Sequence, residues 1–245
     1  MPTIKKILMF LSGFITSLGS LIVICSVLGT REWMSSTIAI SEPSSNGSLV
    51  ITYGLFRGNS FQELDQGLAE PSKEFGELVF AFCSMYLPNT VLVIGQLNNS
   101  SQKSLHLAVM LFLVLSLLTS LLSCVFTLYN SISNPYQTFL GPVGVYTWSG
   151  LSALLTFVSM MLFVGNIQSN HLSEVLAQVL YPLYPRTAYK GTSHSYGYSF
   201  WLLLLIILLN IVTVVIIIFY QRSRRQRKQE QRKLTEHAPR DGILF

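Results

Sequence analysis

Charged residues are scarce in this chain of 245 residues. Asp, Glu, Lys and Arg make up 11% of it and hydrophobic residues 50%, whereas a soluble domain carries about a quarter charged residues. This composition excludes a disordered chain, which needs low hydrophobicity and high charge, and it argues against an ordinary soluble enzyme. The three cysteines, Cys25, Cys83 and Cys124, are too few for a disulfide framework. The sequence therefore indicates a membrane protein.

The missing charges leave long hydrophobic runs. A helix crosses the hydrocarbon core of a bilayer with roughly 20 apolar residues, and four stretches of about that length contain no Asp, Glu, Lys or Arg. We therefore predict transmembrane helices at residues 7–29, 107–129, 145–167 and 198–220. The third run carries several Ser and Thr residues, which a partly buried span tolerates.

Two alternatives to this count are open. Residues 1–29 share with a cleaved signal peptide two lysines ahead of an apolar run, but the run is longer than the roughly 7–15 residues usual for a signal core. Residues 78–95 are also apolar, but they carry Pro88, Asn89 and Thr90 at their centre. We interpret the first segment as a retained span and the second as a membrane-apposed or folded loop segment.

Basic residues flank both ends of the apolar region. Lys5 and Lys6 precede the first run, and eight of the sixteen Lys and Arg residues follow Tyr220. Because Lys and Arg mark cytoplasmic ends, and an even number of spans returns the chain to the same side, we predict a multi-pass plasma-membrane protein with both termini cytoplasmic. The cytoplasmic segments are then 1–6, 130–144 and 221–245, and the extracellular loops are 30–106 and 168–197.

The first extracellular loop shows partial alternation of strand-forming residues. Ser36 to Ile40 and Ser48 to Phe56 mix Thr, Ile, Val and Tyr with small polar residues, and a turn-rich segment that ends in Asn-Gly separates them. These features favour a small antiparallel sheet. Residues 59–76 are more polar, and we expect them to be irregular or partly helical.

The second extracellular loop begins with apolar residues at helical spacing: Leu172, Val175, Leu176, Val179 and Leu180. We predict a helix that continues past the third span and stops at the following prolines. Its apolar stripe either packs on the first loop or rests on lipid as a surface helix.

Three Asn-x-Ser sequons occur in the chain, at Asn46, Asn98 and Asn99. All three lie in the first loop, which the charge pattern independently places outside the cell, and such a motif accepts N-glycans on secreted surfaces. Asn46 lies in the predicted turn, away from the membrane, so we predict it as the glycosylated residue. Asn98 and Asn99 lie close to the second span and are the less favourable acceptors.

Small residues recur every four positions in two of the spans. Ser12, Thr16 and Ser20 follow this spacing in the first, and Ser116, Ser120 and Cys124 follow it in the second; such stripes let helices approach closely. Asn210 is the strongly polar residue of the fourth span. Because ionisable residues, which mark transport paths, are missing from the spans, we interpret Asn210 as an interhelical hydrogen-bonding residue rather than a pore residue.

No residue pattern indicates catalysis, a metal or a cofactor. The four histidines are scattered without the spacing of metal ligands, and no glycine-rich phosphate loop occurs. We therefore predict a protein that is not an enzyme and that needs no cofactor.

A basic segment follows the last span. It predicts binding of anionic lipid, although a topological signal explains the first few charges equally well, and it lacks the interleaved aromatic residues of a nucleic-acid-binding segment. The last three residues, Ile243, Leu244 and Phe245, resemble a ligand of a PDZ scaffold, which adds such an end as a strand. The basic residues are Arg222, Arg224, Arg225, Arg227, Lys228, Arg232 and Lys233.

Three motifs together resemble one known family. Trp33 after the first span, the segment Tyr53 to Gly58, and His171-Leu172-Ser173-Glu174 after the third span resemble the clarins, four-span membrane glycoproteins of the claudin-like group. The sequon at Asn46 resembles the glycosylation position of that family, and residues 239–245 resemble the ending of one paralogue. The resemblance implies a four-transmembrane-helix bundle with a small extracellular β-sheet in the first outer loop.

The sequence departs from the claudin-like pattern in one respect. That pattern has Trp followed by Gly-Leu-Trp and two loop cysteines that form a disulfide; here Gly54, Leu55 and Phe56 replace the second motif, and Cys83 is the one cysteine of the first loop. A disulfide needs two partners a few ångströms apart. We therefore expect the disulfide of the claudin-like pattern to be absent. Its absence puts a role in a tight paracellular barrier in doubt, and Cys83 is then buried, free or paired with another chain.

The resemblance also suggests a role. It implies a protein that organises membrane or cell-adhesion assemblies and meets membrane-protein partners through its spans and outer loops. The alternative is a claudin-like accessory subunit that modulates an ion channel or a receptor.

Overall fold

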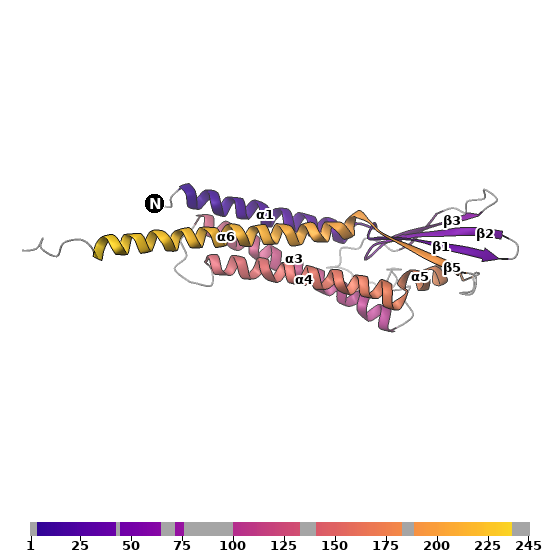
Figure 1. Cartoon of the computed structure of the whole chain (residues 1–245). Helices are drawn as coiled ribbons and strands as arrows, with labels where there is room; N and C mark the ends of the chain where they lie inside the picture. The colour runs from indigo at the N-terminus through magenta and orange to yellow at the C-terminus, as the bar shows by residue number, and fades with distance from the viewer. Residues whose placement is uncertain are drawn as a thin grey trace, which may run out of the picture.

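Four long helices and a five-stranded sheet make up the computed structural model of the chain (Figure 1). The model describes residues 4–42, 45–64, 72–75, 100–132, 141–182 and 189–236. The bundle helices are α1 (Ile4–Gly29), α3 (Ser100–Ile132), α4 (Pro142–Asn170) and α6 (Tyr198–Glu236). The sheet extends from one end of the bundle, and the start of α1 and the end of α6 lie at the other (Figure 1).

All four bundle helices are long and apolar enough to cross a membrane. The candidate spans, Ile7–Gly29, Ser101–Ile132, Pro142–Asn170 and Tyr198–Arg227, have 23 to 32 residues, and at ~1.5 Å per residue each exceeds a hydrocarbon core of about 30 Å. Large apolar side chains such as Ile15 and Phe219 are more than 60% exposed on the outside of the bundle. The prediction of a four-helix membrane bundle with a small antiparallel sheet is therefore confirmed.

The sheet is antiparallel, with the strand order β4-β3-β2-β1-β5. Its central hairpin pairs β1 with β2 from Met34↔Tyr53 to Glu42↔Ser45. Branched apolar residues on alternate positions turn one face of the hairpin inward, which is why the sequence pattern located it. The strands are β1 (Met34–Glu42), β2 (Ser45–Tyr53), β3 (Gly58–Leu64), β4 (Lys73–Phe75) and β5 (Tyr189–Tyr196).

Two parts of the sheet differ from the sequence-based expectation. Within residues 59–76, expected to be irregular or partly helical, the chain forms β3 and β4 instead. β5 belongs to the second outer loop and pairs with β1, so the sheet is not confined to the first loop. Both segments are so polar that no alternation of apolar and polar residues is visible in their sequences. They form strands because they pair with neighbouring strands, which their composition alone does not predict.

The helix expected to continue past the third span is broken. At His171 the backbone has φ 49°, in the left-handed region, and a new helix, α5 (Leu172–Leu180), begins there. Leu172, Val175 and Leu176 of the apolar stripe are buried with sheet residues such as Leu49 and Ile51 in one cluster, Leu180 packs against it, and Val179 is 39% exposed. Of the two alternatives for this stripe, packing on the first loop is the one the structure shows, and the break turns α5 toward the sheet (Figure 1).

Two separate apolar clusters make up the interior. The large cluster runs from the α5–sheet interface into the adjoining end of the bundle, where it includes Ile24, Trp33 and Phe163. The small cluster, at the other end of the bundle, contains Phe10, Val145 and Ile217. Between the two clusters the buried residues of the bundle helices are polar or small.

Candidate functional site

The junction between bundle and sheet, residues 29–33, 54–57 and 197–199, holds the motif residues. Trp33 is fully buried; its Nε1–H donates to the Val27 carbonyl at 2.9 Å, and its ring meets the Phe163 ring edge to face at a centroid distance of 4.9 Å. Its backbone N–H donates to the Tyr53 carbonyl. Trp33 therefore ties α1, α4 and β2 together.

Two glycines let the backbone of the junction pass close by. A Cβ on Gly54 would lie 2.9 Å from the Arg31 Cα, and a Cβ on Gly197 would lie 2.7 Å from the Glu32 carbonyl carbon. Both distances are shorter than van der Waals contact with atoms that cannot rotate away. A side chain at Gly54 or Gly197 would force the backbone segments of the junction to move apart.

Leu55 and Phe56 follow Gly54 in a turn rather than in the expected strand, because β2 ends at Tyr53. Leu55 is buried, and its carbonyl accepts a hydrogen bond of 2.9 Å from His106 Nε2 of α3. Phe56 is partly buried and packs against the large cluster. Phe56, which replaces the Trp of the claudin-like Gly-Leu-Trp pattern, therefore lies at the edge of the apolar core.

A small hydrogen-bond network joins α5 to the inner face of the sheet. The Ser173 hydroxyl lies 2.8 Å from both the Ser36 hydroxyl and the Tyr53 phenol, and Ser36 also lies 3.0 Å from His194 Nδ1. Burial raises the pKa of the Tyr53 phenol above its ordinary value. This network fixes the rotation of α5, a feature that the sequence did not indicate because its members come from four separate elements.

The polar layer is the set of buried residues between the two apolar clusters of the bundle. Hydroxyl pairs join α3 and α4 there: Ser123 to Ser149 at 2.6 Å and Ser116 to Thr156 at 2.7 Å. Such bonds hold apolar helices together where no hydrophobic force acts between them. The layer consists of Gly13, Ser17 and Ser20 of α1; Ser116, Thr119, Ser120, Ser123, Cys124 and Thr127 of α3; Ser149, Ser152, Thr156 and Ser159 of α4; and Asn210 and Thr213 of α6.

Asn210 links three helices at the side of this layer that adjoins the large cluster. Its Nδ2 donates to Ser20 Oγ of α1 at 2.9 Å, to the Ile206 carbonyl at 3.0 Å and, more weakly, to Ser152 Oγ of α4 at 3.5 Å. Asn210 therefore bonds to two neighbouring helices, α1 and α4.

The small residues expected to pack helices differ in their positions. Ser20, Ser116 and Ser120 are buried in the polar layer, and Thr16 bonds the Thr213 hydroxyl at 2.7 Å. Ser12 departs from the expectation, since it is exposed and its hydroxyl bonds the Met9 carbonyl of its own helix. A strict four-residue spacing drifts off a helix face that repeats every ~3.6 residues.

The basic segment continues α6 rather than forming a separate tail. The helix extends to Glu236, well beyond its apolar part, and the described basic side chains of this extension are exposed. They are Arg222, Arg224, Arg225, Arg227, Arg232 and Lys233; Lys228 lies in the same helix.

Several predicted sites lie outside the described residues: Asn98, Asn99, Cys83, the segment 78–95 and the ending Ile243 to Phe245. The backbone of Asn46 is described, and it lies in β2, paired with Ser41, rather than in the expected turn. Cys25 and Cys124 carry free thiols.

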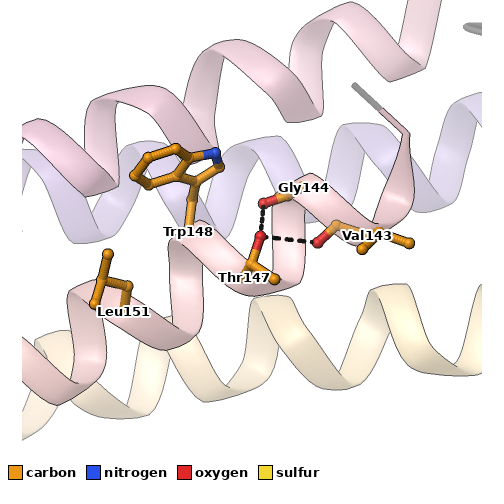
Figure 2. Close-up of a pocket in the computed structure, with 5 residues that line it drawn as sticks. All are labelled: Val143, Gly144, Thr147, Trp148 and Leu151. Atoms are coloured by element: carbon orange, nitrogen blue, oxygen red, sulfur yellow. Dashed lines mark hydrogen bonds between the residues drawn. The ribbon is translucent and has the colours of Figure 1, made fainter. Parts of the chain in front are cut away.

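A pocket of about 220 Å³ is lined by residues of the first turns of α4, which Figure 2 shows as sticks. Thr147 Oγ1 is already bonded to the Val143 and Gly144 carbonyls of its own helix. The lining carries no titratable side chain, and among the described residues no three His, Cys, Asp or Glu side chains gather as metal ligands would. The lining residues are Val143, Gly144, Thr147, Trp148 and Leu151.

Comparison with known proteins agrees with this architecture. The family model described as Clarin-2-like matches residues 4–217. Human clarin-3 is 66% identical and rat clarin-3 62% identical, each over the full length of both chains. Human clarin-1 is 25% identical over 217 residues, 83% of each chain. The chain therefore belongs to the clarin family of multi-pass membrane proteins, and it is more similar to these clarin-3 chains than to clarin-1.

Proposed function

We propose that the protein is a non-enzymatic glycoprotein of the plasma membrane that organises membrane or adhesion assemblies through the outer face of its sheet. The outer face is the side turned away from α5. On it Thr37 of β1 pairs with Val50 of β2 and Ser193 of β5, and Val50 pairs with Phe61 of β3. This face is the observation that carries the proposal.

The side chains of the outer face are of the kinds that favour contact with a protein partner. Thr37 and Ser193 are exposed, Val50 is half-buried, and Phe61 is 36% exposed. Small uncharged side chains cost little to desolvate and give a flat surface, and an aromatic residue at its side supplies the kind of anchor that interfaces favour. Central interface residues are typically uncharged, as these are.

A charge placed on the outer face tests this proposal. Thr37→Arg adds a large cation where contact is proposed, and because Thr37 is exposed the fold should tolerate it. Gln178→Arg adds the same charge to the exposed side of α5 and serves as the matched control. We expect Thr37→Arg, and not Gln178→Arg, to lose the partners that cross-link to the wild-type protein on cells, at equal surface amounts.

The identity of the captured partner separates two forms of the function. Homotypic clusters or scaffold proteins support an organising role, whereas a stoichiometric channel or receptor supports the accessory-subunit alternative. Equal capture by the wild type and both variants would contradict a role for the outer face in either form.

The proposed orientation puts the sheet outside the cell and both termini in the cytoplasm. The basic extension of α6 and Lys5 and Lys6 lie at the end of the bundle opposite the sheet, which supports this orientation because basic ends stay in the cytoplasm. We expect glycosidase to shift the mobility of the wild type but not of Asn46→Gln. An Asn98→Gln/Asn99→Gln variant is the control and should still shift.

The cytoplasmic end is proposed to bind a PDZ scaffold through Ile243, Leu244 and Phe245. Removal of these three residues should reduce retention at the cell surface and binding to the scaffold. Unchanged retention and binding would contradict this part of the proposal.

A further inference from the structure

The polar layer places polar residues at buried positions, where a protein interior usually has apolar ones. On all four bundle helices, every buried residue between the two apolar clusters is Ser, Thr, Asn, Gly or Cys. Phe10, Val145 and Ile217 close the layer at one end, and Ile24 and Phe163 belong to the cluster at the other. On α1, α4 and α6 the layer is therefore bounded at both ends by buried apolar side chains, whereas on α3 buried polar residues continue to Asn130 and Ser131.

Three oxygens in this layer lack a hydrogen-bond partner among the described residues: Ser17 Oγ, Ser120 Oγ and Asn210 Oδ1. All three residues are fully buried. Ser17 lies about one helical turn from Ser20, which bonds Asn210. Ser120 lies about one helical turn from Ser116, whose hydroxyl is 3.0 Å from the Ser152 hydroxyl, and Asn210 donates weakly to that same Ser152 hydroxyl. The three unsatisfied atoms thus lie on three different helices, within or about one turn from one group of hydrogen-bonded residues.

The hydrogen bonds of the layer are also unevenly distributed. Direct bonds join α3 to α4, and the bonds Thr16–Thr213 and Ser20–Asn210 join α1 to α6. Between these two helix pairs, the described side chains of the layer form one bond, from Asn210 to Ser152, and at 3.5 Å it is weak. The unsatisfied oxygens lie on the helices that face this seam.

We propose that the polar layer binds water, with at least one molecule at the seam bridging Asn210 to the hydroxyls of Ser17 and Ser120. A buried polar group surrounded by hydrocarbon is costly unless it is hydrogen-bonded. Buried water typically makes two to four such bonds and is held as part of the structure. Its bonds would supply the connection that the direct contacts between the helix pairs lack.

The chemistry of the layer selects a neutral ligand over a cation. The four apolar stretches contain no Asp or Glu, so no carboxylate would compensate the loss of hydration of a buried cation. Hydroxyls and an amide both donate and accept hydrogen bonds. They can therefore bind water, which also donates and accepts. This inference is independent of the partner-binding proposal, because it concerns the interior of the bundle.

Solid-state NMR of the full chain in lipid bilayers tests the proposal directly. Magnetisation transferred from water should reach the side-chain amide of Asn210 early, although the residue is fully buried. The methyls of Leu113 and Ile206, buried in the apolar cluster, are the dry controls and should receive it late. Transfer to the Asn210 amide as slow as transfer to these methyls would overturn the proposal.

A substitution series tests whether the water bonds the proposed hydroxyls. A hydroxyl bridged by water loses a bond when Ser becomes Ala, so Ser17→Ala and Ser120→Ala should lower the Tm, by about 2–4 °C each for the loss of one bond. Ser123→Ala, which removes a direct bond to Ser149, calibrates the effect. In a dry layer the first two variants would remove an unsatisfied group and raise the Tm, and that result would refute the bridge.

Discussion

Replacement of Trp33 tests whether the junction holds the sheet to the bundle. Trp33→Ala removes a fully buried indole, and truncation of a large buried aromatic costs about 3–5 kcal/mol. That total includes the edge-to-face contact with Phe163, at ~0.5–1.5 kcal/mol, and the hydrogen bond to the Val27 carbonyl, at about 1 kcal/mol. Trp33→Ala should therefore be strongly destabilising.

Trp33→Phe separates these contributions. It keeps a ring against Phe163 and loses the Nε1–H bond and part of the apolar area. The Val27 carbonyl still accepts the Thr30 hydroxyl at 3.0 Å, so it is not left unsatisfied. We expect a loss of about 2–3 kcal/mol, because one hydrogen bond and roughly one or two CH₂ equivalents disappear.

The assay is thermal unfolding of the full chain in nanodiscs. At about 2–4 °C per kcal/mol for a chain of this size, Trp33→Ala should lower the Tm by roughly 6–20 °C and Trp33→Phe by roughly 4–12 °C. Trp201→Ala is the matched control, because Trp201 is 57% exposed and its loss should change the Tm little. A Trp33→Ala shift no larger than the Trp201→Ala shift would refute this account of the junction.

Three further predictions concern single features. Gly54→Ala should lower the Tm by an amount equivalent to about 1–3 kcal/mol of overpacking against the Arg31 backbone, whereas Gly150→Ala, whose Cβ would meet nothing within 4 Å, should not. Burial raises the pKa of the Tyr53 phenol. The neutral phenol therefore contributes stability at pH values below the ordinary tyrosine pKa of about 10, and this stability is lost as the pH rises further. The Tm measured from pH 8 to 11 should fall more for the wild type than for Tyr53→Phe. Neutralising Arg224, Arg225 and Arg227 to Gln should reduce the preference for spin-labelled phosphatidylserine over phosphatidylcholine by up to ~3 kcal/mol, and an unchanged preference, equal to that of a Gln226→Asn control, would contradict lipid binding by the α6 extension.

The bundle was predictable because lipid imposes a local rule on composition. A span needs about 20 uncharged residues in a row, and this requirement is visible without knowledge of any neighbour. The central hairpin was predictable for a similar reason, since the alternation of Ile38, Ile40, Leu49 and Ile51 marks one buried face. His171 was harder, because nothing local marks it as the end of a helix.

The polar layer was predictable only in part. Asn210 was identified because a strongly polar residue within an apolar run is conspicuous. Ser17 was missed, and Ser149 and Ser152 were noted only as polar residues that a partly buried span tolerates. Serine occurs on every face of these helices, and composition does not distinguish Ser12, which is exposed, from Ser17, which is fully buried. The rotation of each helix about its own axis decides between them.

The sequence by itself determined that four uncharged helices cross a membrane, that a hairpin follows the first of them, and that basic residues follow the last. Each of these depends on interactions between a residue and its solvent or its near neighbours along the chain. Only the tertiary structure decided that β5 completes the sheet, that α5 turns onto it, and that hydroxyls from four helices meet between two apolar clusters. These features arise from contacts between residues far apart in sequence, where packing and hydrogen bonding select one arrangement among many that the local sequence allows.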